Sequence, residues 1–397
     1  MNANLCRDHG YDVLYLCSCA LNGVCPDSHR IENMDLDSVY AVSKYHSVNS
    51  ITAVAMETYV ERCGYGKIEA CRNIVDKWIE SRKTVMQRNF LFDIERHEIF
   101  SWMEKEGVWH LPLKGIIIKE MYPRMGMRAM ADNDILFDES FRKKLCDFMV
   151  NRGYTVKQYG KENHDVYIKP PFYNFEMHVN LIPEGHRVSE GYGYYKDVKE
   201  RLIKDKTDNC FRFSDEDYYI YLVTHAYRHY TSAGIGIRTF CDVYVYLERK
   251  KSTLDFNYIE KELEKLGISA FELHLRQLTN NLMGKSDSVI ECLENVLTEE
   301  DRNSIDYYLT SGTYGTVTNW TKQRIGSESD GATKKGRARY VMKRLFPPME
   351  YYKKSHPFLY KTKVFIPAFV VYRWLHQGIK NRKWIIREIR AVLNKDK

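Results

Sequence analysis

The chain has no long uninterrupted hydrophobic run. Its longest apolar stretch, VFIPAFVVY at 364–372, contains Pro367 and falls far short of the roughly 20 residues that a membrane-spanning helix needs. The first residues, MNANLCRDHGYDVLYLCSCALNGV, lack the basic region, the sustained apolar core and the small-residue cleavage site of a secretory signal. We therefore expect no transmembrane segment, no secretion and a cytoplasmic location.

Dense cysteine pairing is also absent. The 10 cysteines are scattered along 397 residues, unlike those of a small disulfide-stapled domain, so a reducing compartment is expected. The residues near the N-terminus that could be interpreted as a zinc cluster are Cys6, His9, Cys17, Cys19, Cys25 and His29. Because the central spacing is C-x-C and no second pair follows, we interpret the cysteines of VLYLCSCAL as thiols packed within a helix.

Acidic residues are scarce at the end of the chain. The whole chain carries a net charge of +7, but from residue 331 onward 18 lysines and arginines stand against 3 acidic residues. This final segment therefore carries +15, and the first 330 residues carry the difference, −8. The basic character belongs to the tail.

The pattern of apolar residues predicts an α+β fold. Up to about residue 105, apolar residues recur at helical intervals of three and four. Alternating strand-like and helix-like segments follow, and helical periodicity then continues from SDEDYYIYLVTHAYRHY onward. We predict an N-terminal helical segment (1–105), a small α/β core with a mixed sheet (106–185), and a C-terminal helical domain with a basic tail (186–397).

Two carboxylates stand one residue apart in RAMADNDILF, at 128–137. If ADNDILF is a strand, Asp132 and Asp134 project from the same face and repel one another unless a cation lies between them. Hard oxygen ligands suit Mg²⁺ together with substrate phosphates. A D-x-D triplet also arises by chance at solvated strand ends, so its neighbours decide the interpretation.

Several neighbours strengthen the metal interpretation. Lys114 and Gly115 close a short strand-like stretch, Arg128 precedes the aspartates, and Glu176 lies in the later strand-like segment NFEMHVNL. Three carboxylates on neighbouring strands could bind two metal ions, which suits in-line phosphoryl transfer. Lysine, arginine and a glycine that admits a phosphate are the accompanying groups expected for a triphosphate.

The order of these motifs resembles the uncharacterised nucleotidyltransferase family, a branch of the DNA polymerase beta-like nucleotidyltransferase superfamily. The matching segments are LPLKGIIIKEMYPRMGMRAMADNDILF and FEMHVNL, with weaker likeness in HAYRHY and RLFPP. The positions that carry the resemblance are Leu113, Lys114, Gly115, Tyr122, Pro123, Arg128, Asp132, Asp134, Glu176 and His178, and later His225, His229, Arg238 and Asp242.

The resemblance implies transfer of a nucleoside monophosphate from an NTP, with Mg²⁺ as cofactor and pyrophosphate as product. By the same resemblance, Asp132, Asp134 and Glu176 are the catalytic residues and metal ligands, and Glu176 helps to deprotonate the acceptor hydroxyl. Lys114, Gly115 and Arg128 are implied to bind the nucleotide. Asn133 departs from the family pattern, which places an aliphatic residue there, so this amide needs a buried partner or an exposed back face.

Other polar residues have plainer interpretations. Lys114 could cap a strand, and Arg128 could form a surface ion pair with Asp138 or Glu139. His178 could pack or act as a ligand beside Glu176. The pair His225 and His229 lacks the glutamate of an HExxH zinc site, so packing or an acceptor pocket is expected, and Arg238 and Asp242 are spaced as an ion pair.

The basic tail, 334–390, interleaves lysine and arginine with aromatic residues. Such a mixture can bind nucleic acid or an anionic membrane surface, but its many apolar residues favour a helical layer that docks on the acidic remainder of the chain. Two alternatives to a nucleotidyltransferase remain. One is a metal-dependent glycosyltransferase that uses a nucleotide-sugar, and the other is a nucleotide- or RNA-binding protein with a decayed site.

Overall fold

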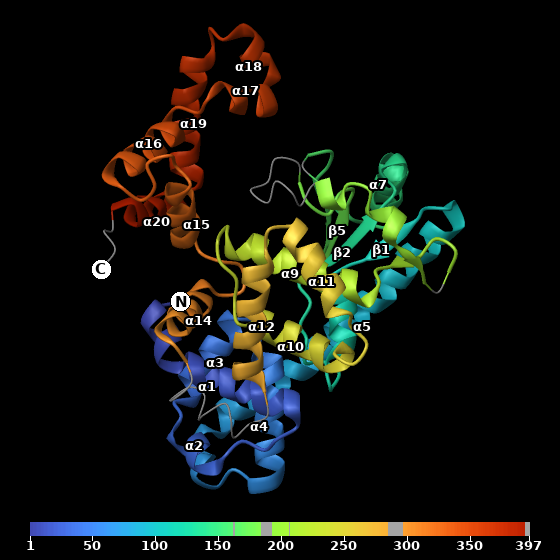
Figure 1. Cartoon of the computed structure of the whole chain (residues 1–397), viewed down its shortest axis with the longest axis vertical. Helices are drawn as coiled ribbons and strands as arrows, with labels where there is room; N and C mark the ends of the chain where they lie inside the picture. The colour runs from blue at the N-terminus through green and yellow to red at the C-terminus, as the bar shows by residue number, and fades with distance from the viewer. Residues whose placement is uncertain (162, 184–192, 206, 285–296, 394–397) are drawn as a thin grey trace. The chain divides into compact units, whose positions relative to one another are not determined.

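The computed structural model describes residues 1–161, 163–183, 193–205, 207–284 and 297–393 (Figure 1). The chain divides into two units. Unit 1 comprises Met1–Arg228 with Ile237–Thr313, and unit 2 comprises His229–Gly236 with Tyr314–Lys397. Each unit is described by itself below.

The first part of unit 1 is helical, as the apolar periodicity predicts. Side chains of Asn2, Asp27 and Asp35 accept hydrogen bonds from the first turns of three of these helices, which satisfies backbone N–H groups that a helix start leaves unpaired. The helices are α1 (Ala3–Asn22), α2 (Ser28–Asn33), α3 (Leu36–Tyr45), α4 (Asn49–Cys63) and α5 (Arg72–Glu106), with the 3₁₀ turn η1 (Gly66–Cys71).

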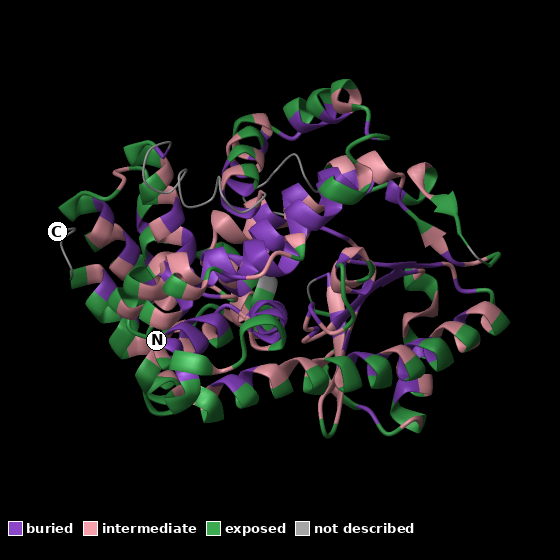
Figure 2. Ribbon diagram, turned by 90° about the horizontal axis from the view of Figure 1, so that it is seen from below, coloured by how far each residue is buried: buried purple, intermediate pink, exposed green. Residues whose placement is uncertain are grey.

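A mixed sheet follows, with strand order β1-β2-β5-β4-β3. Strands β2 and β5 pair in parallel, and the other neighbours are antiparallel. Strands β1 and β2 are buried along their whole length (Figure 2). The strands are β1 (His110–Pro112), β2 (Asn133–Phe137), β3 (Thr155–Gln158), β4 (His164–Lys169) and β5 (Tyr173–His178). The sequence pattern missed β3, which is short and partly exposed.

Short helices connect these strands. Between β1 and β2 lie α6 (Gly115–Ile118) and η2 (Lys119–Met121), and between β2 and β3 lie η3 (Glu139–Phe141) and α7 (Arg142–Asn151). The long helix α5 packs against the sheet through Phe92, Ile99 and Met103, which share one buried cluster with sheet residues such as Ile135 and Phe175. Burial of this cluster fixes the sheet on α5.

The remainder of unit 1 is largely helical. It includes the 3₁₀ turn η4 (Val198–Arg201). A small antiparallel pair of strands follows, β6 (Ile203–Lys204) with β7 (Phe211–Arg212), and the helices come after it. The helices are α9 (Asp215–Tyr230), α10 (Arg238–Lys250), α11 (Phe256–Lys265), α12 (Ser269–Met283) and α14 (Glu299–Ser311). The predicted α+β class with helical flanks is confirmed. The boundaries at 105 and 185 stay predictions, and 186–192 of the third predicted segment lie outside the described residues.

The described part of unit 2 is largely helical, with a helix at 317–326 ahead of the helices of the basic tail. Thr316 and Thr333 cap the first two through their side-chain oxygens. No described helix of either unit is long and apolar enough to span a bilayer. The helices are α15 (Val317–Gly326), α16 (Lys334–Leu345), α17 (Met349–Ser355), α18 (Pro357–Thr362), α19 (Ile366–Lys380) and α20 (Arg382–Leu393).

Candidate metal and nucleotide site

Two carboxylates face each other across the parallel pair of strands. Asp134 in β2 is paired in register with Glu176 in β5. Side chains at paired positions of neighbouring strands project from the same face of a sheet. Asp132 lies directly before β2, which begins at Asn133. The fold thus brings together the three carboxylates that the sequence singled out.

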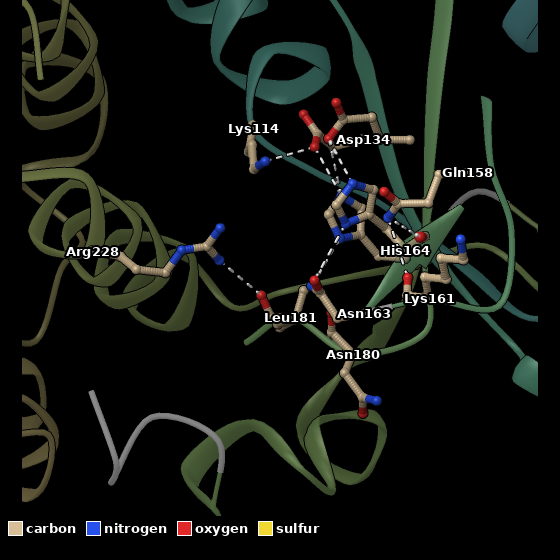
Figure 3. A network of polar contacts seen from close by, with 11 residues as sticks. Lys114, Asp134, Gln158, Lys161, Asn163, His164, Asn180, Leu181 and Arg228 are labelled. Atoms are coloured by element: carbon tan, nitrogen blue, oxygen red, sulfur yellow. Dashed lines mark hydrogen bonds and ion pairs between the residues drawn. The ribbon is translucent and has the colours of Figure 1, made fainter. Parts of the chain in front are cut away.

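Asp134 is held by two nitrogen donors. The Lys114 ammonium donates a 2.6 Å hydrogen bond to Oδ1 of Asp134 (Figure 3). His178 Nε2 lies 2.9 Å from the same oxygen. The Asp134 side chain is 2% exposed. Burial by itself would raise the pKa of this carboxyl, but the Lys114 charge and the His178 hydrogen bond outweigh it and hold the pKa below its usual range.

His178 is a neutral donor to this carboxylate. Burial lowers the pKa of His178 to about 4, despite the opposing effect of Asp134. Because the ionised carboxylate can only accept, the proton of the neutral ring belongs on Nε2. His178 Nδ1 then accepts from Asn163 Nδ2 at 3.4 Å, and the same amide nitrogen donates to Asn180 O at 2.8 Å. The network fixes both the ring and its tautomer.

The other two carboxylates are harder to ionise. Burial, together with the charges of Asp134 and Asp132, raises the pKa of Glu176 to about 7. Burial, then the charge of Asp134, raises the pKa of Asp132, and Lys114, Arg238 and Arg128 oppose this rise. One buried and two partly buried carboxylates therefore repel one another in the absence of a further cation.

The donor set fits a divalent cation. Ligand atoms of Asp134, Glu176 and His178 all lie within 4.8 Å of one another, and among the residues that the structure describes no other such group of three occurs. The two carboxylates supply the oxygen ligands that Mg²⁺ prefers. His178 belongs to this group and Asp132 does not. The charge of Asp132 nevertheless interacts with the carboxylates of Asp134 and Glu176.

The amide oxygen of Asn133 has a buried partner, whereas its amide nitrogen has none among the described residues. Its side chain is fully buried, and its Oδ1 accepts a 2.8 Å hydrogen bond from Arg96 Nη1 of α5. Arg96 also pairs with Asp93, which in turn accepts from Lys119 Nζ at 2.6 Å. The polar residue between the two aspartates thus ties β2 to α5 on the face opposite the site.

Arg128 forms a buried ion pair with Asp242, not the surface ion pair with Asp138 or Glu139 that the sequence left open as an alternative. Its Nε and Nη2 donate to the two oxygens of Asp242 in α10 at 2.8 and 3.0 Å. Tyr122 donates to the same Asp242 at 2.7 Å. This bidentate geometry orients the segment that leads to Asp132, and it gives Asp242 a partner other than the Arg238 that the helical spacing suggested.

Lys114 adopts a strained backbone conformation. Its φ is +46°, in the left-handed region that residues other than glycine rarely occupy. Tyr218 Oη donates to its carbonyl oxygen at 3.0 Å, and Ile118 N donates to the same oxygen at 3.0 Å. Gly115 follows as the first residue of α6. This conformation accompanies the approach of the ammonium to Asp134, and strain of this kind is typical of functional sites.

Sequence reasoning missed His164. Its ring centroid lies 5.0 Å from that of His178, and its Nε2 lies 3.9 Å from Oε2 of Glu176. His164 pairs with His178 in the β4–β5 register, a contact between strands that no local sequence pattern specifies. His225 of α9 lies 6.3 Å from Tyr221 between ring centroids, and neither His225 nor His229 belongs to the described ligand group.

The comparison with protein families decides the assignment. A family model described as an uncharacterised nucleotidyltransferase matches residues 35–284. The chain belongs to the uncharacterised nucleotidyltransferase family. This match confirms the resemblance drawn from the sequence, and it covers the strands, the carboxylates and helices α9 to α12. No curated protein and no solved structure matches the chain.

Proposed function

We propose that the chain transfers a nucleoside monophosphate from an NTP to a hydroxyl acceptor and uses Mg²⁺. The observation that carries the proposal is the in-register pair Asp134 and Glu176 on parallel strands, joined by Asp132 one residue before β2. Membership of a nucleotidyltransferase family supports the class of reaction.

The proposed reaction forms one bond and breaks one. The acceptor oxygen bonds to the α-phosphorus of the NTP, the bond between this phosphorus and the bridging oxygen to the β-phosphate breaks, and pyrophosphate leaves. The acceptor hydroxyl loses its proton, and we assign Glu176 as the carboxylate that helps to receive it. No reductant or oxidant is required.

Asp132, Asp134 and Glu176 would hold the metal. When bound there, Mg²⁺ would neutralise phosphate charge and lower the pKa of the acceptor hydroxyl. The Lys114 ammonium lies 2.6 Å from Oδ1 of Asp134. A phosphate bound to a metal ion at these carboxylates would therefore lie close to this ammonium, and Lys114 would contact it. Gly115, next in the chain, would let the backbone approach the nucleotide. His178 would orient Asp134 through its hydrogen bond to Oδ1.

Arg128 would act mainly by positioning. Its side chain is 9% exposed and donates hydrogen bonds to both oxygens of Asp242. We therefore propose that it fixes the segment before Asp132, in addition to any attraction it exerts on a phosphate. Removal of the pair would then disturb the site through Asp132.

A thermal-shift panel tests the proposal. The protein is heated with each of the four NTPs, and with two or three nucleotide-sugars, each with and without Mg²⁺. Stabilisation by an NTP only when Mg²⁺ is present is expected. It should be lost in Asp132→Asn and Asp134→Asn and kept in Asp147→Asn, which removes the same charge at an exposed position of α7.

Turnover is then followed with an α-labelled NTP. Label transferred to an acceptor, with pyrophosphate released in equal amount, is the expected result. Stabilisation by a nucleotide-sugar alone would replace the proposal with a glycosyltransferase. The absence of any nucleotide effect would replace it with a protein whose site has decayed.

A further inference from the structure

Helix α19 has one covered face, and its opposite face is apolar and exposed. On the covered face Val370 and Arg373 are 6% and 8% exposed. On the opposite face apolar side chains recur at helical intervals from the residues just before the helix. These residues, the α19 stripe, are Val364 (81% exposed), Phe365 (54%), Val371 (51%), Tyr372 (59%), Leu375 (64%) and Ile379 (81%). A surface helix normally turns polar residues to water on this face.

The neighbouring helices extend this exposed apolar surface. Phe358 of α18 is 67% exposed and stacks on Phe365, with ring centroids 6.5 Å apart. Helix α20 exposes Ile386, Ile389 and Leu393, whose spacing of three and four residues places them on one side of the helix. Exposed apolar surface on this scale marks an interaction site.

Positive charge surrounds the stripe. Residues 334–393 contain 16 lysines and arginines against 2 glutamates, a net charge of +14. In the sequence, Lys361 and Lys363 precede the stripe, and Lys380 and Lys383 follow it. All four lysines are exposed. No ion pair joins any of these four to another described residue of the chain, whereas Lys343 of α16 pairs with Glu328 at 2.7 Å.

These features select one occupant. A second copy of the chain would bring the same positive charge against these lysines. A nucleic acid would use the charge and the aromatic rings, but the aliphatic residues Val364, Val371, Leu375 and Ile379 offer bases no stacking surface. An anionic bilayer uses both features, since acyl chains accept the aliphatic groups and headgroups pair with the lysines.

We propose that helices α18 to α20 bind the surface of an anionic membrane. The α19 stripe lies among the acyl chains, and Lys361, Lys363, Lys380 and Lys383 contact the headgroups. Binding takes place in the interface, since no described helix is long and apolar enough to span a bilayer. This proposal is independent of the nucleotidyltransferase reaction.

Vesicle flotation of the full-length protein tests it. The protein is mixed with vesicles of phosphatidylcholine alone or with about 30% phosphatidylserine, at low and high salt. Binding to the anionic vesicles is expected, at least about tenfold stronger than to neutral ones and weaker at high salt. Leu375→Glu with Ile379→Glu should abolish binding, and Lys361→Glu with Lys363→Glu and Lys380→Glu should weaken it at least about tenfold.

Leu273→Glu is the matched control. Leu273 lies in α12 of unit 1 and is 47% exposed, so the same change of character there should leave vesicle binding unchanged. The melting temperature of each variant is measured alongside, and that of Leu375→Glu with Ile379→Glu should equal the wild-type value because both side chains are exposed. A lower value in this variant would mean that the stripe packs within the protein.

Four results would overturn the proposal. They are no binding to anionic vesicles, equal binding to neutral ones, unchanged binding by Leu375→Glu with Ile379→Glu, and a lower melting temperature of this double variant. Failure to bind vesicles combined with a dimer in sedimentation velocity that these substitutions dissociate would assign the stripe to self-association. Failure to bind vesicles combined with a single-stranded RNA complex that the lysine substitutions weaken would assign it to RNA.

Discussion

Arg96 and Asn133 form a buried hydrogen bond of 2.8 Å that links α5 to the strand carrying Asp134. The nearest site residues, Asp132 and Asp134, flank Asn133 on both sides. The bond therefore fixes one face of β2 to α5, while the opposite face of the strand carries the Asp134 carboxylate. It also satisfies the amide oxygen of the polar residue at a position where the family resemblance led us to expect an aliphatic one.

Replacing Arg96 with methionine should destabilise the protein. The change leaves the Asn133 carbonyl oxygen buried without a partner, and the free energy of unfolding should fall by about 2 kcal/mol. Urea unfolding followed by circular dichroism measures it. The double variant Arg96→Met with Asn133→Val removes both polar groups and should recover most of the loss. A double variant less stable than the single one would contradict this account.

Breaking the pair of Arg128 and Asp242 should cost more. Asp242→Asn leaves a buried guanidinium without its carboxylate, so a loss of roughly 3 to 5 kcal/mol in unfolding free energy is expected. Tyr122→Phe, which removes one hydrogen bond to the same carboxylate, should cost only about 1 kcal/mol. Equal losses in the two variants would show that the charge pair is not the dominant contribution. Guanidinium unfolding curves provide both values.

The backbone at Lys114 should favour glycine over other replacements. Its φ of +46° is strained for any side chain with a Cβ, so Lys114→Gly should be more stable than Lys114→Met by about 1 kcal/mol. Both variants lose the ammonium, and both should lose at least about tenfold in affinity for the NTP with Mg²⁺. Thermal unfolding and nucleotide titration separate the two effects. Lower stability of the glycine variant would contradict the assignment of strain.

His46 should make stability depend on pH. Burial lowers its pKa from 6.5 to about 4, although its hydrogen bond to Leu309 O, at 3.0 Å, acts in the opposite direction. Between pH 6.5 and pH 4, His46 therefore binds a proton in the unfolded state but stays neutral in the folded state. The contribution of this group to stability, about 3 kcal/mol, is present above pH 6.5 and is lost as the pH falls toward 4.

The measurement compares wild type with His46→Gln. Glutamine does not titrate and can donate to the same carbonyl, so the unfolding free energy of the variant should fall less between pH 7 and pH 4.5. Other histidines affect both proteins alike, and the difference between the two curves isolates His46. Parallel curves would contradict the depressed pKa.

The sequence by itself determined the class of fold, the family and the order of the site residues. Strand alternation around Asp132 and Asp134 and the later glutamate of FEMHVNL indicated that carboxylates would gather on one sheet, because these signals are local and follow the two-residue period of a strand. Helical periodicity likewise predicted the flanking helices. The residue assignments for metal and nucleotide remain proposals.

Only the tertiary structure decided the partners of these residues. Arg96 meets Asn133, Arg128 meets Asp242 across 114 positions, and His164 meets His178. No local pattern encodes such contacts, since packing of distant elements selects which polar groups share a buried space. The sequence supplied the polar groups, and the packing of elements that are distant in the chain decided which of them became partners.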